Sequence, residues 1–188
     1  MDSEKEKMLN GDLYDADTPE LLSERERARK LTRRYNRTMA DDAEEQRDLL
    51  EELFGSLGEE CYVEPPFRCD YGYNIHVDED FYANFDCVIL DECRVDIGRN
   101  CLIGPGAHIY TATHPLDADE RITGQEYAKP VTISDNVWIG GQAVLNPGVT
   151  VGDNVVVASG AVVTEDVPDD VVVQGNPATV VKNLEATQ

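Results

Sequence analysis

The sequence contains few basic residues for its length. Of 188 residues, 16 are Lys or Arg and 38 are Asp or Glu, which gives a formal net charge of −22 at pH 7. Such a surface repels nucleic acid and anionic membranes, so neither is expected as a partner. Because the acidic residues are spread through the whole sequence, we interpret them as a hydrated surface suited to a high-salt cytoplasm, where screening is short-ranged. A requirement of folding for KCl would test this interpretation.

Cysteines are also few, and long apolar runs are missing. The five cysteines form no CxxC pair, their number is odd, and no signal sequence is visible. These features predict free thiols in a reducing, cytoplasmic compartment. Cys69 and Cys87 lie eighteen residues apart and could stack on successive turns, but small buried thiols are expected instead of a disulfide or a zinc site. No run approaches the roughly 20 apolar residues of a membrane-spanning helix, so we expect a soluble protein.

A six-residue repeat runs from residue 131 to residue 166. Aliphatic residues occupy the first and third places of each hexad, and Gly, Asn, Gln or Asp occupies the sixth. Alternate positions of a short strand point to one side, and the residues in sixth place form corners readily. A strand and a corner every six residues predict a β-solenoid, in which three hexads close one triangular turn. The same frame upstream places Phe85, Asp91, Ile97, Ile103 and Ile109 in third place, with Asp91 as the polar exception.

Residues 115–130 interrupt the repeat with a polar segment that contains two prolines. We expect an extended loop there, because long loops on rigid scaffolds often carry function. A tolerated insertion without function is the alternative.

The amino-terminal part of the chain lacks β-rich runs. Apolar residues at helical intervals predict helices over residues 3–10, 19–39 and 42–55, with Thr18-Pro19 at the start of the second. The sequence therefore predicts a helical module over residues 1–60, a solenoid over 61–180 and a tail over 181–188.

Few histidines are available for acid–base chemistry near neutral pH. The sequence holds His76, His108 and His114. His114 directly precedes the expected loop, and in the hexad count it shares the outward-facing second place with Asn84 and Trp138. These positions make His114 the strongest candidate for a general base. An ordinary surface histidine is the alternative.

Several longer motifs carry a family resemblance. They are EKEKMLNGDLY at 4–14, CDYGYNIH at 69–76, YANFD at 82–86, TATHP at 111–115, KPVTI at 129–133, NVWIGG at 136–141, NPGVTVG at 146–152 and GNPA at 175–178. Together they closely resemble the maltose and galactoside O-acetyltransferase family, over nearly the whole chain. The resemblance implies a mainly β, left-handed parallel β-helix, an exception to right-handed crossovers. It also implies acetyl-CoA as co-substrate, a sugar acceptor, and a homotrimer with active sites between subunits.

The resemblance also implies roles for individual residues. His114 is the expected general base, and Trp138, Gly141, Ser159, Thr164 and Lys182 match cofactor positions. Acceptor positions fall on Tyr82, Asn84 and Glu92, with Asp15 and Asp17 as further candidates because the family's acidic position aligns with Ala16 between them. The frame turns Glu92 outward and Asp91 inward, so we expect Asp91 to serve mainly in hydrogen bonds within a corner, with a direct acceptor contact as the lesser alternative.

The sequence departs from the family at the cofactor end, and two other functions stay open. Glu165 and Thr179 stand where relatives often have Lys and Arg, so weaker binding of coenzyme A is expected. A γ-type carbonic anhydrase shares the solenoid and binds Zn²⁺ with three histidines, but His108 and His114 lie one hexad apart and so on different faces. No metal is therefore expected. An inactive binding or scaffold protein is the third possibility. The identity of the acceptor is not readable from the sequence.

Overall fold

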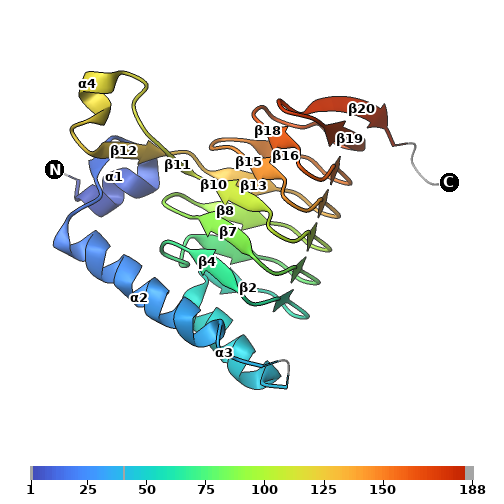
Figure 1. The fold of residues 1–188 in the computed structure, drawn as a ribbon, viewed down its shortest axis with the longest axis horizontal. Helices are drawn as coiled ribbons and strands as arrows, with labels where there is room; N and C mark the ends of the chain where they lie inside the picture. Colours follow the sequence, from blue (N-terminus) through green and yellow to red (C-terminus); the bar gives the residue numbers. More distant parts are fainter. Residues whose placement is uncertain (1, 40, 185–188) are drawn as a thin grey trace.

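The computed structural model describes residues 2–39 and 41–184, which form a three-sided prism of parallel strands with helices at its amino-terminal end (Figure 1). Face 1 consists of β2 (Ser56–Leu57), β5 (Ile75–Val77), β8 (Val95–Ile97), β13 (Val131–Ile133) and β16 (Thr150–Val151). Face 2 consists of β3 (Tyr62–Val63), β6 (Tyr82–Ala83), β9 (Leu102–Ile103), β14 (Trp138–Ile139), β17 (Val156–Val157) and β19 (Val171–Gln174), with β20 (Thr179–Asn183) antiparallel to β19. Face 3 consists of β4 (Phe67–Cys69), β7 (Cys87–Leu90), β10 (His108–Tyr110), β15 (Val144–Leu145) and β18 (Val162–Val163).

The core fills the inside of this prism. The first and third hexad places from Val131 to Val163 are all at most 2 % exposed. Each short strand buries two side chains and then turns, so three strands enclose a narrow apolar column with no room for a second layer. The predicted β-solenoid with inward first and third places is therefore confirmed for this part of the chain.

The length of each coil, meaning one turn around the three faces, varies along the prism. Val63 pairs with Ala83, which pairs with Ile103, so the first two coils each contain twenty residues. Ile103 pairs with Ile139 across a step of thirty-six residues, and Ile139 pairs with Val157 across eighteen. All extra residues fall between a face 3 strand and the next face 1 strand. We call this edge, formed by residues 70–74, 91–94 and 111–130, the elaborated corner.

The twenty-residue coils overturn part of the hexad frame upstream of residue 91. Phe85 was predicted to lie inside the prism, but it follows β6 at a corner and is 49 % exposed. Asn84 lies just after β6, and Tyr82 takes the outward position in register with Leu102 and Trp138. Cys69 and Cys87 do not stack, because Cys69 pairs with Ile89. All five thiols are free in the structure.

Three helices form the amino-terminal part: α1 (Glu4–Asn10), α2 (Pro19–Tyr35) and α3 (Ala43–Leu53). Thr18 caps α2 and Pro19 occupies its first turn, as predicted, whereas α3 ends at Leu53, two residues before the predicted end at residue 55. Apolar residues of α2 and α3 join the prism core at its open end, which shields that end from water. At the other end β20 continues to Asn183 and so includes the first residues of the segment expected as a tail; residues 185–188 lie outside the described residues.

The segment expected as a loop contains structure of its own. The short helix α4 (Ala118–Arg121) lies at its tip, and β12 (Gln125–Ala128) returns antiparallel to β11 (Ala112–Thr113). On its other side β12 pairs with β1 (Tyr14–Asp15) of the amino-terminal part, so a small antiparallel sheet stands beside the prism (Figure 1). Residues far apart in the sequence thus meet at the elaborated corner.

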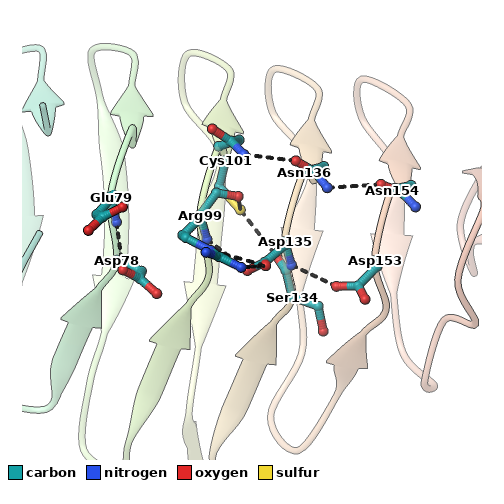
Figure 2. Close-up of polar contacts among 10 residues, drawn as sticks. Asp78, Glu79, Arg99, Cys101, Ser134, Asp135, Asn136, Asp153 and Asn154 are labelled. Carbon is teal, nitrogen blue, oxygen red and sulfur yellow. Dashed lines mark hydrogen bonds and ion pairs between the residues drawn. The ribbon is translucent and has the colours of Figure 1, made fainter. Parts of the chain in front are cut away.

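The corner between faces 1 and 2 is closed by a ladder of short polar side chains. The amide of Asn136 accepts a hydrogen bond from Asn100 and donates one to Asn154, each at 3.0 Å, and Asp153 accepts the backbone N–H of Asp135 (Figure 2). Asn100, Asn136 and Asn154 all have φ between 56° and 59°, a left-handed conformation that Asn tolerates better than most residues. The polar residue in sixth place of the hexad therefore forms the corner and also hydrogen-bonds to the next coil.

None of the described helices is long and apolar enough to cross a membrane.

Candidate active site

Buried carboxyl groups gather at the elaborated corner. The side chain of Asp91 is completely buried, and its Oδ1 accepts the backbone N–H groups of Asp70 at 3.1 Å and Tyr71 at 2.9 Å. Its Oδ2 accepts the N–H of Asn74 at 3.4 Å. Asp91 thus organises the extra residues of the coil below it, and the expected inward, corner-forming role fits this geometry. Burial raises the pKa of Asp91 to about 7, against the lowering effect of these backbone donors.

Glu92 also lies inside this corner, and the prediction that it points outward was wrong. Its side chain is 5 % exposed, and Oε2 accepts a hydrogen bond from the hydroxyl of Thr111 at 3.3 Å. The reason is the two-residue extension of the coil, which turns the backbone at residues 91 and 92 out of the alternation of a strand. Burial, together with a hydrogen bond to the side chain of Asp70, raises the pKa of Glu92 to about 9.

His114 follows β11 at the edge of the same corner. Its side chain is 54 % exposed, and its Nε2 lies 3.6 Å from Oε2 of Glu126, which is 13 % exposed. Glu126 belongs to β12, opposite Tyr14 of β1, and its Oε1 accepts a hydrogen bond from the Tyr14 hydroxyl at 3.1 Å. The antiparallel sheet therefore places a carboxylate directly beside the imidazole.

Glu126 is a candidate residue that the sequence did not reveal. It lies in the segment interpreted as an irregular loop, where no periodicity predicted strand β12 or its pairing with β1. A signal was present in the segment QEYA at 125–128, whose Tyr and alternating polarity are compatible with a short strand. Its partner strand has only two residues, too short for pattern analysis to detect.

A second group of predicted residues lies on face 2. Trp138 projects from β14 and is 55 % exposed, in register with Leu102 and Tyr82 on the preceding coils. The Tyr82 ring stacks on Tyr62 with ring centroids 6.2 Å apart. Asn84 follows at the end of β6 and is half-buried. These side chains form an outward-facing ladder that is largely aromatic and apolar.

The predicted cofactor positions cluster mainly beside this ladder. Gly141 and Ser159 line a pocket at the corner between faces 2 and 3, together with Phe85, Asp86, Pro105, Gly106 and Gln142. A side chain at Gly141 would bring its Cβ within 3.1 Å of the carbonyl oxygen of Pro105, so glycine keeps this corner open. Lys182 lies on the exposed strand β20, in register with Val172 of face 2. Thr164 instead follows β18 on the edge that leads from face 3 to face 1.

The structure therefore divides the predicted site into two halves within one chain. His114, Glu92 and Thr164 lie along the edge between faces 3 and 1, whereas Tyr82, Asn84, Trp138, Gly141 and Ser159 lie on face 2 or at its corner with face 3. The width of face 3 separates the halves. The pocket lined by Gly141 and Ser159 does not include His114.

Asp15 and Asp17, the remaining acceptor candidates, are both exposed. Oδ1 of Asp15 accepts the N–H of Asp17, and the carboxylate of Asp17 lies 3.5 Å from Arg25. Asp15 is in register with Gln125, next to Glu126 on β12. The structure thus brings β1 close to His114 but gives neither aspartate a contact with it.

The other two histidines belong to different surfaces. His76 lies on face 1, where its Nδ1 is 3.1 Å from the hydroxyl of Ser56, and His108 lies on face 3 beside Tyr110. Burial lowers the pKa of His76. Among the residues that the structure describes, no group of three or more His, Cys, Asp or Glu side chains is arranged to hold a metal ion.

Comparisons with known proteins match this architecture. Residues 7–58 match the family model of the maltose acetyltransferase hexapeptide capping motif, and residues 130–165 match that of the bacterial transferase hexapeptide with six repeats. The crystal structure of a maltose O-acetyltransferase from Clostridium difficile 630 superposes with a TM-score of 0.97 at 52 % identity, over 98 % of this chain and 99 % of that one. The galactoside O-acetyltransferase of Escherichia coli K12 is 39 % identical over 95 % of this chain and 88 % of its own length.

A galactoside acetyltransferase in complex with coenzyme A superposes with a TM-score of 0.95 at 38 % identity, over 98 % of this chain and 92 % of that one. These likenesses define a left-handed parallel β-helix of the hexapeptide-repeat acyltransferase class, as the sequence predicted. Within that class the chain belongs to the maltose and galactoside O-acetyltransferase family, close to maltose O-acetyltransferase. It is an acetyltransferase, and the galactoside acetyltransferase that it resembles was solved with coenzyme A bound.

Proposed function

We propose that the chain transfers the acetyl group of acetyl-CoA to a hydroxyl of a sugar, either a maltose- or glucose-like sugar or a galactoside, by direct attack with His114 as general base. The observation that carries the proposal is the position of His114, an exposed imidazole at a corner lined by buried carboxyl groups. The carboxylate of Glu126, 3.6 Å from the imidazole, accepts hydrogen bonds from hydroxyls and repels anions. The surroundings of His114 therefore favour a neutral polyhydroxyl acceptor.

The reaction needs one base and a site for a developing oxyanion. As the acceptor oxygen bonds to the thioester carbonyl carbon, its proton passes to Nε2 of His114. The carbonyl becomes a tetrahedral oxyanion, and the donors proposed to stabilise it are backbone N–H groups near Gly141. The intermediate then expels the coenzyme A sulfur, which takes up the proton from His114. No covalent enzyme intermediate is required.

We propose that the active protein is a homotrimer with its sites between subunits. The outward side chains of face 2 are largely aromatic and apolar, with Leu102 at 49 % and Trp138 at 55 % exposure, and those of face 3 include Val88, Leu90, Val144 and Val162 beside Arg68 and His108. Face 1 presents Ser56, His76, Asp96, Thr132 and Thr150 instead. The apolar side chains on faces 2 and 3 suit a three-fold assembly, since each subunit then covers a face 2 with a neighbour's face 3 edge.

A subunit-mixing experiment tests both proposals. His114→Ala and Trp138→Ala proteins are each expected to have lost most activity with acetyl-CoA and a sugar, measured as thiol release. After the two are mixed and allowed to exchange subunits, part of the activity should return, because some sites receive His114 from one copy and Trp138 from the other. Near-normal turnover by His114→Ala would refute the role of the base, and absence of any recovery would refute a shared site.

We also propose that this chain binds coenzyme A more weakly than relatives that have Lys and Arg at positions 165 and 179. Glu165 and Thr179 are both exposed and carry no positive charge, and Lys182 is the cation on β20. Glu165→Lys should lower the KM for acetyl-CoA by a few-fold at low salt, since an exposed charge pair contributes only about 1 kcal/mol. An unchanged KM would mean that the coenzyme A phosphate does not approach residue 165.

The five free thiols support the further proposal of a cytoplasmic location.

A further inference from the structure

Helix α2 forms a cationic surface on this acidic chain. It carries six of the chain's 16 basic residues and only three acidic ones. The helix packs against β4 (Figure 1), and the groove beside them has a volume of about 600 Å³. Its lining includes Arg29 and Arg33 of α2, Arg68 of β4, and the carboxylates of Glu26 and Asp70. We call it the arginine groove.

The charges in the arginine groove are not balanced within the chain. Arg29 lies 3.8 Å from Asp70, and Glu26 is already paired within α2. Nε of Arg33 donates to the carbonyl oxygen of Arg29 at 3.1 Å, and Arg68 is exposed. Within residues 2–39 and 41–184, neither Arg33 nor Arg68 has a carboxylate at ion-pair distance. Two guanidinium groups are therefore left for an anionic partner.

Face 2 carries the opposite charge at the same end of the prism. Its first two coils run through residues 59–64 and 79–86, each with three acidic residues and no Lys or Arg. Glu64 directly follows β3, and its Oε1 accepts a hydrogen bond from the Tyr82 hydroxyl at 3.4 Å. Its side chain is half-buried, and no cation of the described residues lies at ion-pair distance from it. This carboxylate thus also lacks a counter-ion within the chain.

A second copy of the chain can bring these two surfaces together. The proposed shared site sets the face 3 edge of one copy against face 2 of the next, and a three-fold axis along the prisms keeps every coil at its own level. β3 and β4 belong to the same coil, so Glu64 of one copy is level with Arg68 of the other. Asp70 links this region to the site, since it lines the arginine groove and also hydrogen-bonds to Glu92 at the elaborated corner.

We propose that the arginine groove receives Glu64 of the partner subunit, which pairs with Arg68 and Arg33 and closes the amino-terminal end of the interface. The inference rests on the proposed trimer and adds the contact that aligns its subunits. Copies with a formal charge of −22 each repel one another, so a place where opposite charges meet favours association at low salt and fixes which faces meet.

Charge reversal tests whether the pair forms between copies. Glu64→Arg and Arg68→Glu each place like charges in every interface, and each alone should weaken trimer formation about tenfold or more at low salt. Mixing the two variants should restore trimers that contain both, because two of the three interfaces in a mixed trimer then hold opposite charges. A pair within one chain would stay broken after mixing. Analytical ultracentrifugation measures association, and native mass spectrometry counts the two chains in each trimer.

Arg47 and Glu51 supply the matched control, since they form an ion pair within α3 at 2.8 Å. Arg47→Glu and Glu51→Arg make the same charge changes and should leave association unchanged and mixing random. Glu64→Gln keeps an acceptor for Tyr82, so it replaces the reversals if they fold poorly. It should weaken the trimer at low salt and match the wild type in 1 M KCl, where charges are screened beyond about 3 Å.

The possible failures are distinguishable. Trimers of wild-type stability from the Glu64 and Arg68 variants would overturn the inference and leave the proposed trimer intact. A wild-type chain that stays monomeric at every salt concentration would refute the proposed assembly and this contact with it. The role of His114 is tested apart from both, because association is measured without substrate.

Discussion

Oδ1 of Asp91 accepts the backbone N–H of Tyr71 at 2.9 Å, a bond that ties two successive coils together at the elaborated corner. The same carboxyl group also holds the N–H groups of Asp70 and Asn74. Buried backbone donors that lose their partner cannot reach water. The stability of this corner therefore depends on one side chain.

Asp91→Ala should lower the free energy of unfolding by about 3 kcal/mol or more, because it leaves buried N–H groups unsatisfied and opens a cavity. Urea unfolding monitored by circular dichroism measures the loss. Asp91→Asn, which keeps one acceptor oxygen, serves as the control, and its free energy of unfolding should fall less than that of Asp91→Ala. Equal stability of the alanine variant and the wild type would contradict the structure of this corner.

The raised pKa of Glu92 should make the free energy of unfolding depend on pH. Its pKa is raised from 4.5 to about 9 on folding, by burial first and by the hydrogen bond to Asp70 second, so the folded state keeps a proton that the unfolded chain releases. This contribution to stability is complete below pH 4.5 and is lost as the pH rises through about 9. Glu92→Gln should match the wild type near pH 5 and exceed it at pH 9 by at least about 1.4 kcal/mol, the equivalent of one pKa unit.

Urea titrations of both proteins at pH 5, 7 and 9 and at one protein concentration supply the measurement. The comparison between them removes the general effect of the high net charge, which both proteins share almost equally. Parallel curves for the two proteins would show that Glu92 is ionised in the folded state.

Two buried tyrosines beside the site should respond differently to loss of the hydroxyl. The hydroxyl of Tyr71 has no hydrogen-bond partner within the described part of the chain, whereas that of Tyr14 donates to Glu126. Tyr71→Phe should leave the free energy of unfolding unchanged or raise it by up to about 1 kcal/mol, and Tyr14→Phe should lower it by about 1 to 2 kcal/mol. Thermal denaturation of the two variants compares them directly, and the reverse order would contradict the assignment.

Asn136 allows a test of the polar ladder at the opposite corner (Figure 2). It has a φ of 59° and bonds to Asn100 and Asn154. Asn136→Ala and Asn136→Gly both lose the ladder, but only alanine also has to adopt a left-handed conformation. The glycine variant should therefore be more stable than the alanine variant by about 1 kcal/mol, despite its greater flexibility when unfolded. Urea unfolding measures both, and a more stable alanine variant would show that the corner relaxes.

The sequence predicted the prism and the inward side chains of its carboxyl-terminal coils, because hexads without insertions repeat there. Upstream, a shift of two residues preserves the alternation of a strand, so Ala83 and Ile89 face inward in either frame. The error shows only where the two frames differ: Phe85 was expected inside and is exposed, and Glu92 was expected outside and is buried. Coil length depends on corners, and corners carry little periodic signal.

The site could be predicted only in part, for a related reason. His114 and Trp138 belong to specific motifs, and the structure places both at exposed positions. Glu126 was missed because its position in β12 depends on pairing with Tyr14, more than a hundred residues away. Such long-range pairing leaves no mark in a local pattern.

The thirty-six-residue step between Ile103 and Ile139 has a further consequence. It is a multiple of six, so the segment that carries His114 and Glu126 adds the length of one coil without changing the phase of the strands around it. Faces 1 and 2 pair across the insertion as if it were not there. Along this single edge the chain can grow, shrink or change composition while the rest of the prism keeps its register. Changes in length or composition along this edge can therefore alter the surroundings of His114 and leave the pairing of the strands intact.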